Sequence, residues 1–537
     1  MHGMRASFYT ASFLLIALPW LSPLAPGPSP SVVPLLLSWF CFLVLIAGFL
    51  FLQLKVSAET STRFWVAQHA VQIAAAAWVA AGAISAVIGL VQYAGLSHLA
   101  EPFINSSAIG TAFANLRQRN QFASLTNIGL VALIYMATRC VDRPKLTSTS
   151  TSTSTSQSTS TSTSTSTPPV ASLFFISLAG LLMLGNAAAS SRTGMVQLGL
   201  LVLLYALWQG LHERAVRSIL LAAVLFYAGA VYFLPLSVGL EPFSQGLPAR
   251  LGLDEGCSSR LVLWSNVITL IAQKPWLGWG WGELDYAHFS TLYSGPRFCD
   301  ILDNAHNLPL HLAVELGVPN ALLICGGFAW WVLRQKPWAE RDATRQMAWA
   351  VVAIILLHSM LEYPLWYGPF QMAFVLCVGL LRRRKPPIQP LASPKNTFNW
   401  PLGQVLRVPA AMCLIAFIGY AAWDYHRISQ IYLEPESRSA AYRTDTLNKV
   451  RSSWLFADQV QFAELLTTPL APANAAWTLN MAKHLLHYSP EPRVIEKAIE
   501  SAVMLGQDDD ALAYLARYRA AFPNEHALWA KANAKQL

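Results

Sequence analysis

A histidine flanked by two asparagines offers the clearest acid–base chemistry in the chain. Residues 303–317 read DNAHNLPLHLAVELG, so an apolar run follows the histidine directly. Asn307 and Pro309 suit the start of a helix, because asparagine caps well and proline is tolerated in the first turn. His306 would then lie at the positive end of a helix dipole, where anions bind and a neutral imidazole can accept a proton. The alternative is a histidine whose ring is satisfied by loop carbonyls.

Two arginines stand in polar stretches that could bind an anion. Arg192 is the only charge in SSRTG (190–194), and Arg260 opens the amphipathic run that follows CSS at 257–259. A guanidinium group presents a fork of donors that matches the oxygens of a phosphate. The alternatives are an incidental arginine at the membrane face and, for Arg260, an interfacial helix anchored by tryptophans.

A dense group of amide and guanidinium side chains occurs in ANLRQRNQFAS (114–124). Such groups suit an oxygen-rich ligand, although an interfacial loop with snorkelling arginines would have the same composition. The substrate-binding candidates in this stretch are Asn115, Gln118, Arg119 and Gln121.

A fifth polar stretch, HSMLEYPLWYGPF (358–370), separates two apolar runs near the end of the hydrophobic region. Glu362, Tyr363 and Tyr367 flank a proline there. We include these three residues, together with Asn307, among the substrate-binding candidates. An aromatic belt at the membrane interface is the alternative interpretation.

Composition places these stretches in a membrane protein. Of the 537 residues, 54% are hydrophobic and only 12% are charged, with a mean hydropathy of +0.40, whereas soluble domains carry roughly 25% charged residues. The net charge of +9 lies mostly in short loops between apolar runs. That distribution is typical of the positive-inside rule rather than of nucleic-acid binding, so we expect the lipid bilayer and no nucleic acid as a partner.

The apolar runs predict an all-α polytopic protein with about eleven transmembrane helices of about 17–25 residues. We expect spans near 7–24, 31–53, 66–93, 120–138, 170–189, 194–210, 217–238, 308–333, 346–361, 367–381 and 405–424. The first run is interpreted as a retained span, with a removed signal peptide as the alternative.

Alternate loops carry the basic residues, which places them in the cytoplasm and the polar stretches on the outer, periplasmic face. The predicted organisation is N-terminal transmembrane helices (1–238), a periplasmic catalytic loop (239–307), C-terminal transmembrane helices (308–424) and a periplasmic helical domain (425–537) resembling tetratricopeptide repeats. A serine- and threonine-rich cytoplasmic segment, 143–168, is predicted to be disordered.

Cys257 and Cys299 both fall in the long outer loop, where an oxidising periplasm would permit a disulfide. Two free buried thiols are the alternative. The chain contains no phosphate-binding glycine loop and no metal-binding motif, so we predict no cofactor and no metal site. The energy for a reaction on the outer face must then arrive with the substrate, and a lipid-linked pyrophosphate would bring its own leaving group.

The five stretches resemble the O-antigen ligase and polymerase superfamily, and specifically PglL-type bacterial O-oligosaccharyltransferases. ANLRQRNQFA and LEYPLWYGPF resemble segments of the PglL branch. SSRTG, SRLVLW with KPWLGWGWG, and NAHNLPLHLAVELG resemble the superfamily core. The similarity covers most of the membrane region.

The resemblance implies an enzyme of the bacterial inner membrane that transfers an oligosaccharide from undecaprenyl diphosphate to serine or threonine hydroxyls of pilins or other periplasmic proteins. By motif, Arg192 and Arg260 would hold the donor diphosphate without a metal, and His306 would orient or deprotonate the acceptor. Gln118 or Gln121, with Tyr363 or Tyr367, would shape the sugar or acceptor pocket. The alternatives are an O-antigen ligase acting on lipid A core, an O-antigen polymerase and, from another class, a transporter or flippase.

Overall fold

The computed structural model describes residues 2–25, 27–55, 60–141, 169–245, 247, 256–382 and 407–534. Throughout these ranges the regular structure is helical and contains no strand, which confirms the predicted all-α class. The segment predicted to be disordered, 143–168, lies outside the described residues.

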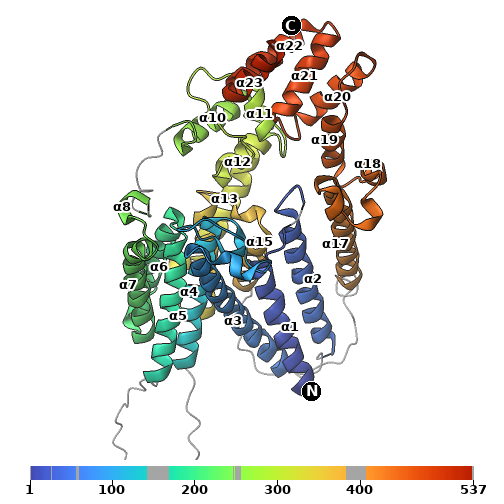
Figure 1. Cartoon of the computed structure of the whole chain (residues 1–537). Helices are drawn as coiled ribbons and strands as arrows, with labels where there is room; N and C mark the ends of the chain where they lie inside the picture. The colour runs from blue at the N-terminus through green and yellow to red at the C-terminus, as the bar shows by residue number, and fades with distance from the viewer. Residues whose placement is uncertain are drawn as a thin grey trace, which may run out of the picture.

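The membrane region is a bundle of helices that alternate in direction along the chain (Figure 1). Its first seven helices are α1 (His2–Leu21), α2 (Val32–Lys55), α3 (Thr60–Tyr93), α4 (Arg119–Val141), α5 (Pro169–Ala188), α6 (Arg192–Leu207) and α7 (Arg214–Ser237). The later ones are α13 (Val318–Gln335), α14 (Ala343–Ser359), α15 (Gly368–Arg382) and α17 (Arg407–Ser429). In the described part of the chain, four helices are both long and apolar enough to cross a bilayer, namely α2, α3, α4 and α7.

Helix α4 forms the centre of the bundle and packs against α3, α5, α6 and α14. Within its apolar span 89% of the residues are buried, against 17% for α2, which lies at the edge of the bundle. Gly82 of α3 and Gly129 of α4 face each other where these helices pack: a Cβ atom on Gly82 would lie 3.6 Å from the Gly129 Cα atom and 2.9 Å from Cδ2 of Leu182. Small residues commonly allow such close backbone approach between membrane helices.

The predicted span 308–333 is wrong as a single helix. The structure divides it at Gly317 into α12 (Leu308–Leu316) and α13. Gly317 has φ +86° and ψ 157°, a conformation available almost only to glycine. As a result α12 packs with the preceding loop, whereas α13 runs along the outside of the bundle, where Ala321 is its one buried residue and Phe328, Trp331 and Val332 contact the core.

The tryptophan-rich segment of the outer loop stabilises this break. Val318 donates its N–H to the Pro275 carbonyl at 2.8 Å, and Gly280 donates to Glu315 at 3.0 Å. These bonds satisfy backbone groups that the interruption would otherwise leave unpaired. Gly278 and Gly317 lie so close to the opposite backbone that neither has room for a Cβ atom.

The outer loop contains α8 (Pro242–Gln245), α10 (Arg260–Gln273) and α11 (Leu284–Ser290). Buried side chains from α10, α11 and α12 share a core that includes Leu263, Val267, Leu284 and Val314. Cys257 and Cys299 are joined in a disulfide with a Cα–Cα distance of 5.3 Å, and this bond closes the loop over a separation of 42 residues.

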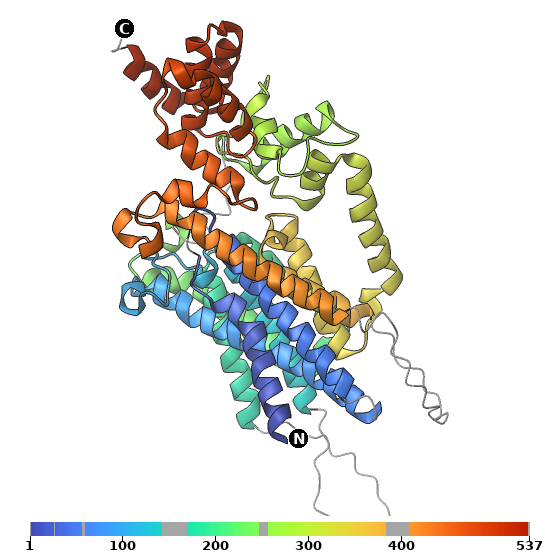
Figure 2. The same ribbon diagram turned by 90° about the vertical axis from the view of Figure 1, so that its right-hand side faces the viewer.

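The C-terminal tail packs on this loop rather than standing apart from it (Figure 2). Its helices are α18 (Thr446–Val450), α19 (Ala457–Thr467), α20 (Ala475–Leu485), α21 (Pro492–Met504), α22 (Asp508–Ala521) and α23 (Pro523–Ala534). Phe289 of α11 belongs to the tail's hydrophobic core. The Tyr286 and His487 rings stack with centroids 3.7 Å apart, and Arg517 donates to the Ser290 carbonyl at 3.1 Å. The tail therefore braces the loop.

Replacing Gly317 with alanine should destabilise the protein strongly. The substitution adds a clash with the Trp276 carbonyl to a backbone conformation that alanine avoids, so we expect a loss of about 3 kcal/mol or more. Gly282→Ala is the matched control, because Gly282 has φ +80° with open space around it and should cost only about 1–2 kcal/mol. Thermal unfolding of both detergent-solubilised variants measures the difference; equal shifts would contradict the close crossing.

Cys257 and Cys299 should resist alkylation until the protein is reduced, because both sulfur atoms are held in the disulfide. Cys140 is a free, exposed thiol and provides the internal control, since it should react without reduction. Mass spectrometry of the alkylated, unfolded chain measures both. Labelling of Cys257 and Cys299 before reduction would rule out the bond.

Candidate active site

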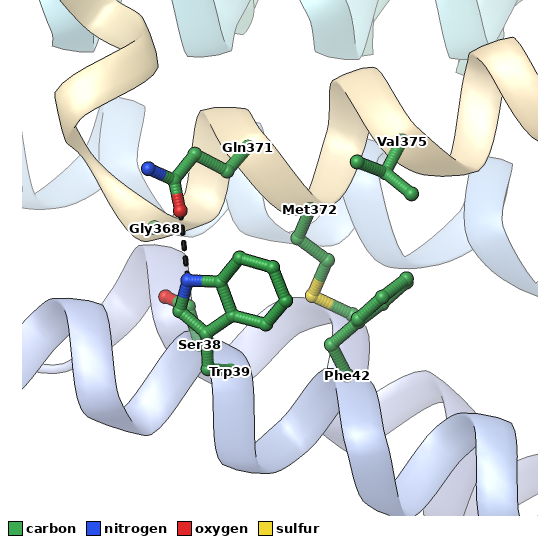
Figure 3. Close-up of a pocket in the computed structure, with 7 residues that line it drawn as sticks. All are labelled: Ser38, Trp39, Phe42, Gly368, Gln371, Met372 and Val375. Carbon is green, nitrogen blue, oxygen red and sulfur yellow. Dashed lines mark hydrogen bonds between the residues drawn. The ribbon is translucent and has the colours of Figure 1, made fainter. Parts of the chain in front are cut away.

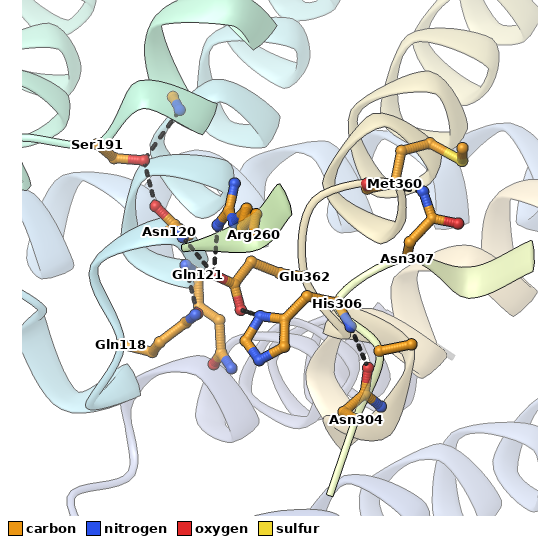
Figure 4. A network of polar contacts seen from close by, with 12 residues as sticks. Gln118, Asn120, Gln121, Ser191, Arg260, Asn304, His306, Asn307, Met360 and Glu362 are labelled. Carbon is orange, nitrogen blue, oxygen red and sulfur yellow. Dashed lines mark hydrogen bonds and ion pairs between the residues drawn. The ribbon is translucent and has the colours of Figure 1, made fainter. Parts of the chain in front are cut away.

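A single carboxylate, that of Glu362, joins three distant parts of the chain (Figure 4). Its Oε1 atom lies 2.9 Å from Nη2 of Arg260 and accepts a hydrogen bond from Nδ2 of Asn120 at 3.1 Å. Its Oε2 atom lies 3.1 Å from Nδ1 of His306. Only 10% of the Glu362 side chain is exposed, against 32% for Arg260 and 27% for His306. The carboxylate thus lies at the base of a site whose basic partners reach solvent.

The partners of Glu362 come from the beginnings of helices. Arg260 is the first residue of α10, where the Ser259 side chain accepts a hydrogen bond from the Val262 N–H. His306 directly precedes Asn307, whose side chain caps α12 as the sequence predicted, accepting from the Leu310 N–H at 3.2 Å. Since helix N-termini carry partial positive charge, their convergence here favours an anion.

Arg192 lies at a third helix start, that of α6, where it is half-buried. Its neighbour Ser191 caps this helix through the Gly194 N–H and donates its hydroxyl to Oδ1 of Asn120 at 2.6 Å. Asn120 in turn donates to Glu362. The backbone at Arg192 is therefore connected to Glu362 through two hydrogen bonds.

The backbone at His306 adopts the left-handed conformation, with φ +49°. Its N–H donates to Oδ1 of Asn304 at 2.9 Å, and the Ala305 carbonyl accepts from the Trp264 indole at 3.1 Å. Ser190 has the same φ value on the other side of the site. Non-glycine residues held in this conformation concentrate at functional sites, where the surrounding structure imposes it.

The charge of Glu362 is set by two opposing effects. Burial raises the pKa of this carboxyl, but the hydrogen bond and charge of His306 and the charge of Arg260 lower it more, so that its pKa falls below the ordinary value of 4.5. Glu362 is therefore an anion at neutral pH and holds the imidazole by Nδ1. The Nε2 atom of His306 has no partner among the residues that the structure describes.

An open cavity of about 430 Å³ adjoins this group. It is lined by Thr111, Phe113, Arg117, Gln118, Arg119, Asn120 and Ser190. Arg119 donates to the Thr111 hydroxyl at 2.9 Å, and the Gln118 side chain accepts from the Gln121 N–H at 3.1 Å. The predicted residues Gln118 and Arg119 thus line a polar cavity beside Asn120.

Two tyrosines close another side of the site. The Tyr363 ring meets the His306 ring edge-on at 5.1 Å, and Tyr367 stacks on Tyr363 at 5.9 Å. Burial, together with nearby negative groups, raises the pKa of Tyr363, so its hydroxyl stays protonated and able to donate a hydrogen bond. Tyr367 also interacts with the buried Gln121 side chain.

Two of the predicted residues have structural contacts instead. Asn115 donates to the carbonyls of Leu21 and Phe103 at 2.8 and 3.0 Å, which fastens its loop to α1. Asn307 uses its side chain for the helix cap and for a bond to the Met360 carbonyl at 3.2 Å. A contact of either side chain with a ligand stays a prediction.

Sequence reasoning missed a buried polar layer beneath the site. The Ser124 hydroxyl lies 3.0 Å from Nδ1 of His358 and accepts from Gln197 at 2.8 Å, and all three side chains are buried. Ser124 follows Asn120 by four residues on one face of α4, and Glu362, in the turn after α14, donates its N–H to the His358 carbonyl at 2.8 Å, so each pair is one turn apart. A histidine at that spacing, inside an apolar run, was the available signal.

Comparison with known proteins gives three family models in chain order. A model described as "Protein glycosylation ligase" matches residues 112–137, which contain Gln118 and Asn120. The model "O-Antigen ligase" matches 175–325, the region of Arg192, Arg260 and His306. A third, "Virulence factor membrane-bound polymerase, C-terminal", matches 346–537.

Two curated proteins of Acinetobacter baylyi are similar to this chain. A general O-oligosaccharyltransferase is 24% identical over 333 residues, which is 60% of this chain and 53% of the relative. A ComP-specific O-oligosaccharyltransferase is 24% identical over 277 residues, 52% of this chain and 44% of the relative. The matches thus span about half the length of these relatives.

No solved structure matches the chain significantly. The three family models cover each of the segments that meet at Glu362, and the two relatives carry the same type of name. These matches make the chain similar to the O-antigen ligase family and, through the glycosylation-ligase model and the two relatives, to O-oligosaccharyltransferases.

Proposed function

We propose that this protein transfers an oligosaccharide en bloc from undecaprenyl diphosphate to serine or threonine hydroxyls of pilin or other periplasmic proteins. The observation that carries the proposal is the sharing of Glu362 by His306 and Arg260. One oxygen of this carboxylate orients the His306 imidazole, which can accept a proton. The other oxygen orients Arg260, which can bind an anion. A glycosyl transfer with a diphosphate leaving group needs these two functions side by side.

His306 acts on the acceptor in this proposal. Glu362 holds Nδ1, which leaves Nε2 to accept the proton of the acceptor hydroxyl as its oxygen attacks the anomeric carbon. The new bond joins this oxygen to the sugar, while the bond between the sugar and the diphosphate oxygen breaks. The electron pair leaves with the diphosphate.

Arg260 and Arg192 act on the donor. Guanidinium groups near the diphosphate stabilise the negative charge that grows as the sugar departs, and the helix starts of α6 and α10 add positive potential there. The protein's own cations supply this charge, so the proposal requires no metal. The cavity lined by Gln118 and Arg119 has the polarity to hold sugar hydroxyls.

We place the site on the periplasmic face of a bacterial inner membrane, because the basic loops predict that orientation and the lipid-linked donor is reached from the bilayer. Deletion of the gene, followed by intact-mass measurement of the pilin, tests the acceptor. Loss of a glycan mass from the pilin is the expected result.

An O-antigen polymerase or ligase is the second candidate, favoured by the polymerase model that matches residues 346–537. The chemistry would be unchanged, but the acceptor would be a growing glycan or lipid A core. Purified protein with lipid-linked glycan and both acceptors separates the candidates. Extension of lipopolysaccharide alone would replace the leading proposal, and movement of the donor lipid without any transfer would indicate a transporter.

Glu362→Gln should lower kcat on the order of 100-fold, because the neutral glutamine amide offers no charged acceptor to His306 and Arg260. Because the pKa of Glu362 is below 4.5, its carboxylate stays ionised from neutral pH down through mildly acidic pH, and its contribution is lost only as pH falls through this lowered pKa. Glycosyl transfer by purified protein measures both effects. Glu340→Gln is the matched control, because it breaks the ion pair between Glu340, in the loop from α13 to α14, and Arg345 of α14. Equal loss of activity in both variants would count against the role proposed for Glu362.

The double variant Arg192→Lys with Arg260→Lys should lose turnover by about 100-fold or more while remaining in the membrane. Lysine keeps the charge but cannot donate a fork of two hydrogen bonds. Transfer from lipid-linked donor measures the loss, and size-exclusion chromatography in detergent checks the fold. Near-normal activity would argue against the binding of diphosphate by these side chains.

A further inference from the structure

A narrow lipid-facing groove with a free volume of about 10 Å³ lies on the contact between α2 and α15, next to the turn of the candidate site. Its upper part is lined by Ser38, Trp39, Phe42, Gly368, Met372 and Val375 (Figure 3). Gly368 directly follows Tyr367, the tyrosine that stacks on Tyr363 in the site. The groove therefore begins one residue from the turn that carries Glu362.

Gln371 connects the rim of this groove to the site. It accepts a hydrogen bond from the Trp39 indole at 2.8 Å, as Figure 3 shows, and donates to the Leu365 carbonyl in the turn after Glu362 at 2.8 Å. Trp39 remains 40% exposed on the face toward the lipid. A chain seated in the groove would thus contact a tryptophan that is fastened to the turn of the active site.

Deeper in the bundle the groove leads into an apolar cavity of about 340 Å³ between α1, α2, α3 and α15. Phe42 and Val375 line both the groove and the cavity, so the two adjoin each other. Ser12 is the one polar side chain among the described residues that line it, and Gly379 forms an open edge with no atom within 4 Å of its Cβ position. An apolar cavity of this size does not hold ordered water.

The length of this path suits a long hydrocarbon chain. From Ser38 to Leu50, both of which line it, α2 advances about 18 Å at about 1.5 Å per residue. That is more than half of the roughly 30 Å hydrocarbon core of a bilayer. The undecaprenyl chain of the proposed donor is longer than one leaflet, and therefore extends past the midplane wherever its diphosphate lies at the outer surface.

We infer that the groove and cavity between α2 and α15 bind the polyprenyl chain of the lipid-linked donor and so position its diphosphate at Arg192 and Arg260. This inference rests on the proposed function. Within a bilayer the hydrophobic effect does not favour one hydrocarbon chain over another. The shape of the groove and its position next to the site therefore decide which lipid chain binds there.

Gly379→Phe tests the inference, because a side chain at this open position fills the cavity without a backbone clash. Gly199→Phe is the matched control: Gly199 lies in α6, exposed, with equally open space and no contact with the cavity. Each protein is reconstituted in nanodiscs and assayed with the same glycan on undecaprenyl diphosphate and on a short polyprenyl diphosphate of three isoprene units.

We expect Gly379→Phe to raise KM for the long-chain donor by about fivefold or more at unchanged kcat. This pattern is expected when a substitution weakens binding of the substrate and of the transition state equally. The short-chain donor and Gly199→Phe should give wild-type values. An equal rise for both donors, or no rise for either, would overturn the inference.

A binding measurement separates this inference from the proposed function. Undecaprenyl diphosphate without a glycan should be retained by wild-type protein in native mass spectrometry and lost from Gly379→Phe, whether or not transfer to protein is found. Retention of phospholipid in its place, displaced by Gly379→Phe, would assign the cavity to a structural lipid and overturn the inference. Transfer activity that fails in wild-type protein while polyprenyl diphosphate binding persists would contradict the proposed function alone.

Discussion

The carboxylate of Glu362 is the constraint on which the site depends. A buried anion is costly unless it is paired and hydrogen-bonded, and Glu362 is satisfied only when Arg260, His306 and Asn120 all reach it. Arg260 begins α10, His306 lies just before α12, and Asn120 is in the first turn of α4. The electrostatic requirement of one side chain thus sets the positions of three helix ends relative to α14.

That constraint explains why the outer loop is so firmly built. His306 and Arg260 reach solvent, so their positions depend on the packing of α10 and α12 behind them. The disulfide closes the loop, the glycine crossing at Gly278 and Gly317 directs α12 away from α13, and the tail packs on α11. Catalytic geometry tolerates little displacement, and this support is consistent with a site that must be held before the substrate arrives.

The site also has a polarity gradient. On its outer side lie the open cavity and two basic side chains, which favour a charged and hydroxylated ligand. Beneath it, Ser124, His358 and Gln197 satisfy one another within the apolar bundle. Along α2 and α15 the path is apolar. These three surroundings have the polarity that the proposed donor, with its sugar, diphosphate and hydrocarbon chain, would require.

Local sequence determined much of this protein, because helices in a bilayer must be apolar, must begin at caps and must satisfy their own backbone. The all-α class, the cap at Asn307 and the selection of His306, Arg260 and Glu362 as candidates followed from residue type and spacing. Tertiary structure alone decided that Glu362 joins Arg260, His306 and Asn120, since Arg260 lies 102 residues and Asn120 lies 242 residues from it along the chain. It also decided that Gly317 ends α12: the run 308–333 contains Gly317 and Pro319, which permit a break, and the close crossing of the loop backbone at Gly278 fixes the break there. Contacts between distant segments depend on packing, and packing is not a property of any one segment.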